Sequence, residues 1–86
     1  MIYIATNLHG RGIKHVTAFE DRLDLLSYVD EITAFTETVV NSRDNIDTLC
    51  DKLSDRGMGS GSRSHARVSR REAHDLVRNG ALPYGF

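Results

Sequence analysis

The histidines and the single cysteine are the side chains of this chain best suited to metal binding or nucleophilic catalysis. His9, His15, His65 and His74 include no pair four residues apart on a predicted helix, the spacing that places two ligands on one helix face. Cys50 falls among the apolar positions of a predicted helix, so we expect a buried structural thiol and not an activated nucleophile. No pair of carboxylates stands out as an acid–base couple. The sequence therefore predicts no catalytic residue, no metal and no cofactor, and we expect that the protein is not an enzyme.

A glycine-rich stretch is the next candidate for chemistry. Residues 57–64 read Gly-Met-Gly-Ser-Gly-Ser-Arg-Ser. A phosphate-binding loop normally leaves a strand and enters a helix at once, and the P-loop type carries a Lys-Ser/Thr pair. Here the glycines follow a predicted helix, and no lysine comes after them. We interpret residues 57–64 as a flexible linker.

Four aspartates repeat with helical spacing on a helix predicted over residues 44–56. They are Asp44, Asp47, Asp51 and Asp55. They fall within about 80° of one another and opposite the apolar positions of the same helix. Their mutual repulsion opposes helix formation, and only the first two gain from the helix dipole. Three interpretations stay open: a solvated face, a docking surface for a basic partner such as one that binds nucleic acid, and ion pairing within the protein.

The C-terminal part of the chain carries the opposite charge. All five bases of residues 57–86 are arginines: Arg63, Arg67, Arg70, Arg71 and Arg78. On a predicted last helix Arg71, His74 and Arg78 share a face, and Arg67 joins them if the helix starts early. Planar guanidinium groups suit phosphates and carboxylates alike. The open interpretations are contact with nucleic acid, neutralisation beside the aspartate row, and a protein–protein contact.

Hydrophobic periodicity predicts the elements that hold these residues. Strands are expected over 2–6 and 13–19, joined as a hairpin, and a helix over about 21–32. Residues 33–40 are rich in β-branched side chains and predict a third strand, with a longer helix as the alternative. The helix over 44–56 should end at Gly57, and the last helix should run from a capping box at Ser69 and Glu72 to Gly80.

This pattern predicts an α+β fold. We expect a small antiparallel sheet in β-β-α-β-α order with helices on one face, plus a C-terminal helix after the Gly/Ser linker. The organisation would be a compact body over 1–56, the linker over 57–64, and a basic helix and tail over 65–86, within one domain. A chain of 86 residues buries only about 60–65% of its unfolded surface. A partner subunit would therefore add stability, and a homodimer stays open.

The net charge of −1 hides a division along the chain. Residues 1–56 carry ten acids and six bases, whereas residues 57–86 carry two acids and five bases. One cysteine allows no internal disulfide, which fits a reducing compartment. The N-terminal segment lacks the basic flank of a signal peptide, and no apolar run reaches the roughly 20 residues needed to span a bilayer. We therefore expect a cytoplasmic protein that does not use a membrane.

One short segment resembles a known family. Residues 69–80, Ser-Arg-Arg-Glu-Ala-His-Asp-Leu-Val-Arg-Asn-Gly, resemble the second helix of S4-type RNA-binding domains. The resemblance covers about a dozen residues. That family continues past its glycine into a strand, where this chain has Pro83 and then ends.

Binding is the function that these features favour. Our leading hypothesis is a small non-enzymatic protein that occupies a surface on a larger protein or nucleoprotein complex. Phage and mobile-element accessory proteins that inhibit host machinery, anti-CRISPR proteins included, are similar in size and in lacking catalytic residues. The expected contact comprises the aspartate row with Asp24 and Glu31.

Two alternatives remain for the basic segment and the tail. One is a nucleic-acid-binding module whose contacts are Arg63, Arg67, Arg70, Arg71, His74 and Arg78. The other, weaker alternative is an antitoxin-like regulator, in which a folded body carries a tail that orders on its target. The sequence leaves the partner, the oligomeric state and any pairing of the two charged rows undecided.

Overall fold

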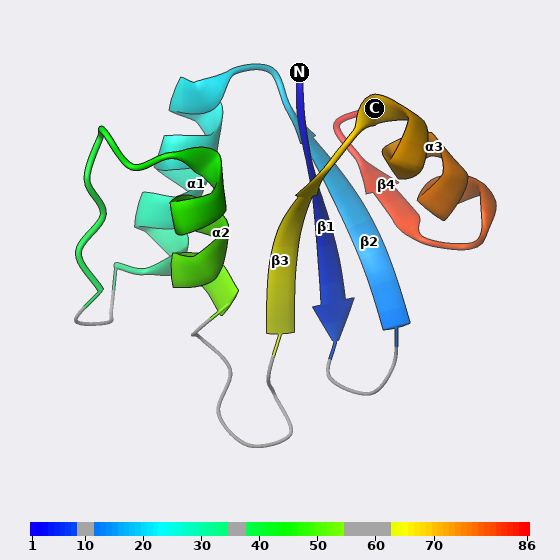
Figure 1. Ribbon diagram of the computed structural model, residues 1–86, viewed down its shortest axis with the longest axis horizontal. Helices are drawn as coiled ribbons and strands as arrows, with labels where there is room; N and C mark the ends of the chain where they lie inside the picture. Colours follow the sequence, from blue (N-terminus) through cyan, green and yellow to red (C-terminus); the bar gives the residue numbers. More distant parts are fainter. Residues whose placement is uncertain (9–11, 35–37, 55–62) are drawn as a thin grey trace.

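The computed structural model describes residues 1–8, 12–34, 38–54 and 63–86. Their elements follow in the order β1 (Ile2–Leu8), β2 (Gly12–Phe19), α1 (Arg22–Ile32), α2 (Ile46–Ser54), β3 (Arg63–Val68), α3 (Arg70–Arg78) and β4 (Leu82–Tyr84). The four strands described form one mixed sheet in the order β3-β1-β2-β4 (Figure 1). The prediction of a small α+β fold is confirmed, and so is the hairpin of β1 and β2.

The sheet is mixed because of the path taken by α3. β1 lies between β2 and β3 and is antiparallel to both, whereas β4 pairs with β2 in parallel. The chain leaves β3, crosses the sheet as α3, and returns to the starting end before β4 begins. A strand that follows such a crossover runs in the same direction as the strand before it. The prediction of a purely antiparallel sheet in β-β-α-β-α order is therefore wrong.

Helices cover both faces of the sheet. Ile2 and Ile4 of β1 pack against buried residues of α1 and α2, which include Leu25 and Leu49. The alternate residues of β1 pack on the other side, where Ala73 of α3 completes the second cluster. The prediction that the sheet's helices share one face is wrong. A strand buried on both sides reads as a continuous apolar run, as the first strand does here.

The predicted strand over residues 33–40 is absent from the part of that segment that the structure describes. Thr33 caps the end of α1: its hydroxyl donates to the Val29 carbonyl at 2.8 Å, and its amide donates to the same oxygen at 3.0 Å. Ala34 lies in a turn, residues 38–40 have no regular structure, and residues 35–37 lie outside the described ranges. The third strand comes instead from residues 63–68, the end of the predicted linker and the residues after it. Residues 57–62 of that linker also lie outside the described ranges.

The helix boundaries follow their capping residues. Asp21 caps α1 by accepting the Asp24 amide, and Ser69 and Glu72 form the predicted capping box of α3. Asn45 caps α2, because its side-chain oxygen accepts the Thr48 amide at 2.8 Å. The helix predicted from residue 44 therefore begins later, at Ile46.

The C-terminal residues are part of the sheet. Gly80 ends α3 with a positive φ of 110°, and its amide donates to the Val77 carbonyl at 3.0 Å. β4 follows, and Pro83 is tolerated there because β4 is an edge strand. Gly85 has a φ of 78°, and a Cβ at this position would lie 2.6 Å from the Ala18 carbonyl oxygen. This close approach fixes the tail against β2.

Candidate binding surfaces

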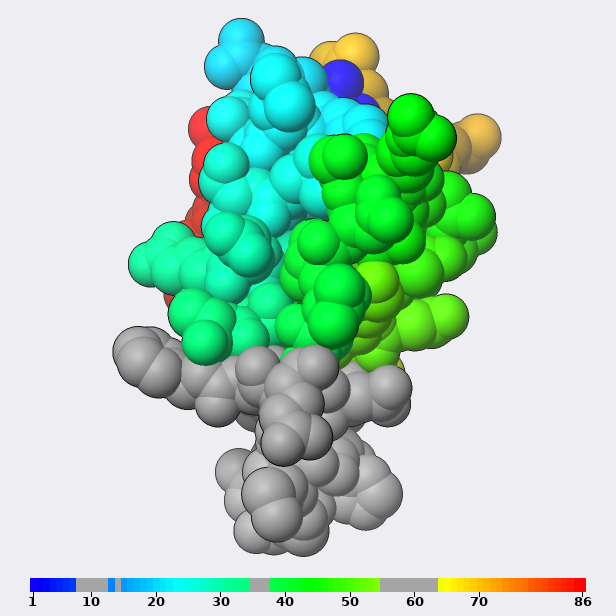
Figure 2. All heavy atoms as spheres, turned by 90° about the vertical axis from the view of Figure 1, so that its left-hand side faces the viewer, coloured from blue at the N-terminus to red at the C-terminus, as the bar shows by residue number. Residues whose placement is uncertain are grey.

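The helical layer formed by α1, α2 and the segment between them is strongly acidic. We call it the acidic layer and define it as described residues 20–34 and 38–54. It carries eight acidic residues and three basic ones. Figure 2 shows α1 and α2 next to one another on this face of the molecule. Buried apolar residues of both helices fix the layer on the sheet.

On α1, three carboxylates lie on the outer surface. Asp24, Asp30 and Glu31 are all exposed. The helical period places them on either side of Ser27, which is opposite the buried Leu25 and Val29. Asp24 and Glu31 were predicted from the sequence. Asp30 was missed because it does not lie on the same side of the helix as Asp24 and Glu31. All three side chains are nevertheless exposed on the outer face of α1.

On α2, the structure keeps two members of the predicted aspartate row. Asp47 and Asp51 are exposed, and no described residue forms an ion pair with either of them. Asp55 lies outside the described ranges. Asp44 precedes the helix, so its predicted place in the helical row is wrong.

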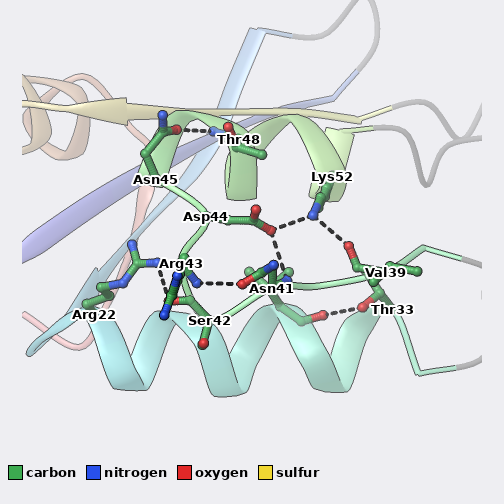
Figure 3. A network of polar contacts seen from close by, with 11 residues as sticks. Arg22, Thr33, Val39, Asn41, Ser42, Arg43, Asp44, Asn45, Thr48 and Lys52 are labelled. Carbon is green, nitrogen blue, oxygen red and sulfur yellow. Dashed lines mark hydrogen bonds and ion pairs between the residues drawn. The ribbon is translucent and has the colours of Figure 1, made fainter.

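Asp44 instead belongs to a polar network that joins α1 to α2 (Figure 3). Its carboxylate pairs with the Lys52 ammonium and accepts the Asn41 amide at 3.0 Å. The hydrogen bond from Lys52 is the main cause of a lowered pKa at Asp44, and the hydrogen bond from Asn41 is the next. Lys52 also donates to the Val39 carbonyl at 2.6 Å. The network therefore fixes the 38–45 segment against the last turn of α2.

The same segment is tied to the first turn of α1 and divides the acidic layer. The Arg22 guanidinium donates to the Ser42 carbonyl at 2.6 Å (Figure 3). The positive charge of Arg22 is therefore held within the acidic layer. Arg43 is exposed between the two helices. The predicted contacts on α1 and α2 therefore form two acidic areas on one layer and not a single stripe.

Cys50 has a structural role at the edge of the sheet. It is 3% exposed, and burial, followed by the charges of Asp47 and Asp51, raises the pKa of its thiol to about 11. The backbone N–H of Arg67 partly offsets this rise in the pKa, and the Ser54 hydroxyl accepts the N–H of His65 at 2.9 Å. α2 therefore covers the outer edge of β3 with side chains one helical turn apart. The prediction of a buried thiol is confirmed.

The basic residues of α3 lie on the opposite side of the sheet from α2. Arg71, His74 and Arg78 are exposed on one face of α3, as predicted. Asp75 lies within this row and is 3.8 Å from the Arg78 guanidinium, which reduces the positive charge there. The His74 ring contacts the Phe86 ring, with their centroids 5.3 Å apart. Because α2 and α3 pack on different faces, their charged rows do not neutralise each other.

The other predicted basic residues are placed by β3 and by the start of α3. Arg63 and Arg67 belong to β3, so the suggestion that Arg67 extends the helical row is wrong. Arg70 is the first residue of α3. Arg67 pairs with Ile4 of β1, so its side chain lies on the sheet face that α1 and α2 cover, where it lines a cavity with Asp47 and Arg22. The sequence spacing gave no sign of this cavity, because the pairing of β3 with β1 brings Arg67 to it.

The described residues contain no group of three side chains arranged to hold a metal ion. The buried Thr6 of β1 lies between two histidines: His15 is its partner on β2, and His65 is its partner on β3. His9 lies outside the described ranges. Within the same ranges, no helix has the length and apolar character required to cross a membrane.

Comparisons with protein-family models, with curated proteins and with solved structures find no match to this chain.

Proposed function

We propose that this protein is a non-enzymatic binding protein that docks its acidic layer onto a basic surface of a larger protein. One observation supports this most strongly. The exposed carboxylates of α1 and α2 have no ion-pair partner among the described residues, while two of the three bases of the layer already donate to groups within it. The outward field of the layer is therefore negative. Such a field attracts a positively charged partner and repels nucleic acid.

The construction of the layer suits recognition. Leu49 and Leu53 of α2 are fully buried, and the Asp44 network holds the connecting segment in place. Carboxylates on helices fixed in this way lose little conformational freedom on binding, which favours affinity. A basic surface that normally grips nucleic acid has the complementary charge. Inhibition of a nucleoprotein machine, as by phage accessory proteins, is the biological role that we propose from size and charge.

Affinity capture with matched variants tests this proposal. The tagged protein would be compared with Asp47→Lys/Asp51→Lys, which reverses two exposed charges, and with Arg71→Glu/Arg78→Glu, which changes α3. We expect a protein that is retained after nuclease treatment, lost with the aspartate variant and kept with the arginine variant. Retention by the aspartate variant would contradict the proposal. A complex that needs nucleic acid and the α3 arginines would favour the nucleic-acid alternative.

A further inference from the structure

One cavity opens in the acidic layer itself, between α1 and the segment that follows it. It has a volume of about 300 Å³. Its lining is Leu26, Ser27 and Asp30 of α1 with Val40 and Ser42 of that segment. The three residues of α1 are three and four positions apart, so they lie along one side of the helix. We call this the α1 cavity.

The α1 cavity has an apolar floor that belongs to the core. Leu26 and Val40 are half-buried, and both pack against the buried cluster that fixes the acidic layer on the sheet. The polar network bonds both neighbours of Val40, because the Val39 carbonyl accepts from Lys52 and the Asn41 amide donates to Asp44. The cavity is therefore formed before a partner arrives, and filling it costs little conformational freedom.

The rim of the α1 cavity is polar and carries one negative charge. The Asp30 carboxylate is exposed, and no described residue forms an ion pair with it. Ser27 and Ser42 add hydroxyl oxygens, which accept hydrogen bonds from a cation. Neither Arg22 nor Arg43 belongs to the lining, and Arg22, already bonded to the Ser42 carbonyl, precedes Asp30 by about two helical turns. The negative end of the cavity is therefore the Asp30 end.

This lining fits a side chain that is apolar along its length and positive at its end. Arginine and lysine both lay their aliphatic stems on apolar surfaces and keep their charged heads at polar groups. Arginine fits better, because its rigid fork of N–H donors can meet a carboxylate and a hydroxyl group together. The volume lies at the small end of the range for small-molecule sites, roughly 300–1,000 Å³, so it suits a single side chain.

We propose that the α1 cavity receives one arginine side chain of the basic partner. The stem would lie on Leu26 and Val40, and the guanidinium would pair with the Asp30 carboxylate and donate to the serine hydroxyls. Leu23 is 71% exposed on the same side of α1 and would add apolar contact beside the cavity. Arginine anchors in preformed pockets are frequent hot spots of protein interfaces. This inference rests on the proposed function, because it names one contact that the acidic layer makes with its partner.

Amide-resolved NMR titration with short peptides tests the α1 cavity without the partner. The probes are acetyl-Gly-Arg-Gly-amide and the same peptide with lysine or with citrulline, which keeps the shape of arginine but not its charge. All are added at constant ionic strength. We expect saturable shifts at the amides of Ser27, Asp30 and Val40 with the arginine peptide, weaker binding of the lysine peptide, and no saturation with citrulline. Arginine shifts that do not saturate, or that either other peptide reproduces in full, would overturn the proposal.

Asp30→Asn and Glu31→Gln are matched variants, because they remove exposed carboxylates from successive residues that point to different sides of α1. Asp30→Asn should weaken binding of the arginine peptide and of the captured partner by about tenfold, the loss expected for one charged hydrogen-bonding group. Glu31→Gln should leave the affinity for the peptide unchanged. Equal losses with both variants would show general charge attraction and would overturn the proposal. The spectra themselves report whether each variant is folded.

The arginine anchor and the docking function can fail separately. A partner that is lost with Asp47→Lys/Asp51→Lys but binds Asp30→Asn as tightly as the wild type would support the acidic layer as the contact and overturn the arginine anchor alone. If no captured partner depends on Asp47 and Asp51, the docking function fails, and the peptide titration still decides whether the α1 cavity binds arginine.

Discussion

Asp44 and Asp47 are three residues apart, yet the structure gives them different roles. Asp44 pairs with Lys52 inside the polar network, whereas Asp47 is exposed on α2. The helical spacing of the aspartates is correct for Asp47 and Asp51. Periodicity cannot place the first residue of a helix, because that position depends on which side chain bonds to the free amides, and here Asn45 does so.

The Asp44–Lys52 pair makes the stability of the fold depend on pH. The pKa of Asp44 is lowered from 3.8 in the folded protein, so the folded state favours the charged carboxylate. This stabilisation is complete above the unfolded pKa and is lost as the pH falls through the lowered pKa. Asp44→Asn should therefore lower the melting temperature at pH 7, and the difference from the wild type should shrink as the pH approaches the lowered pKa. Thermal unfolding followed by circular dichroism across this range measures both effects.

Asp51→Asn is the control for this prediction. It removes an equal charge from an exposed position where no described residue forms an ion pair. Its melting temperature should match that of the wild type at pH 7 or exceed it. If both variants lose the same stability, the Lys52 pair is not the cause.

Cys50 should react slowly with alkylating agents. With a pKa of about 11, only about a thousandth of the thiol is ionised at pH 8, and the side chain is also buried. Mass spectrometry after iodoacetamide treatment should show little labelling of the native protein and full labelling in denaturant. Labelling of the native protein as fast as that of a short peptide would show that the thiol is accessible.

At the scale of the elements, β3 is the segment that sequence patterns identify least well. Its sequence, Arg-Ser-His-Ala-Arg-Val, follows a glycine-rich stretch and has few of the residues that favour strands. It forms a strand because β1 pairs with it on one side and α2 covers its other edge. Both interactions join residues far apart in the sequence. By contrast, the hairpin and the capping box of α3 depend on neighbouring residues, and both were predicted.

The cover over the β3 edge can be tested through Ser54. Ser54→Ala removes the oxygen that accepts the His65 amide at 2.9 Å, so the protein should lose about 1 kcal/mol of stability in chemical denaturation. Hydrogen exchange at the His65 amide should become faster. Ser27→Ala, on the exposed face of α1, is the matched control and should leave both unchanged. Equal behaviour of the two variants would mean that α2 does not protect the edge.

At the scale of the whole molecule, the sheet separates the arginines of α3 from the acidic layer. The composition of the two parts of the chain showed the division, with an acidic N-terminal part and arginines near the C-terminus. It did not show that the division becomes spatial, because this requires α3 to cross to the face opposite α1 and α2. The parallel pairing of β4 with β2 completes that crossover. Such long-range pairing leaves no local pattern in the sequence.

The affinity of the captured partner for matched charge variants tests the central claim most directly. The purified partner would be titrated with the wild type, with Asp47→Lys/Asp51→Lys, and with Asp75→Lys, which reverses an exposed acid on the other side of the sheet. If the acidic layer is the contact, the double variant should bind at least about tenfold more weakly, and more so at low salt, because like charges then face each other. Asp75→Lys should bind as the wild type does. Equal affinities for the wild type and the double variant would contradict the role of α2 in the acidic layer.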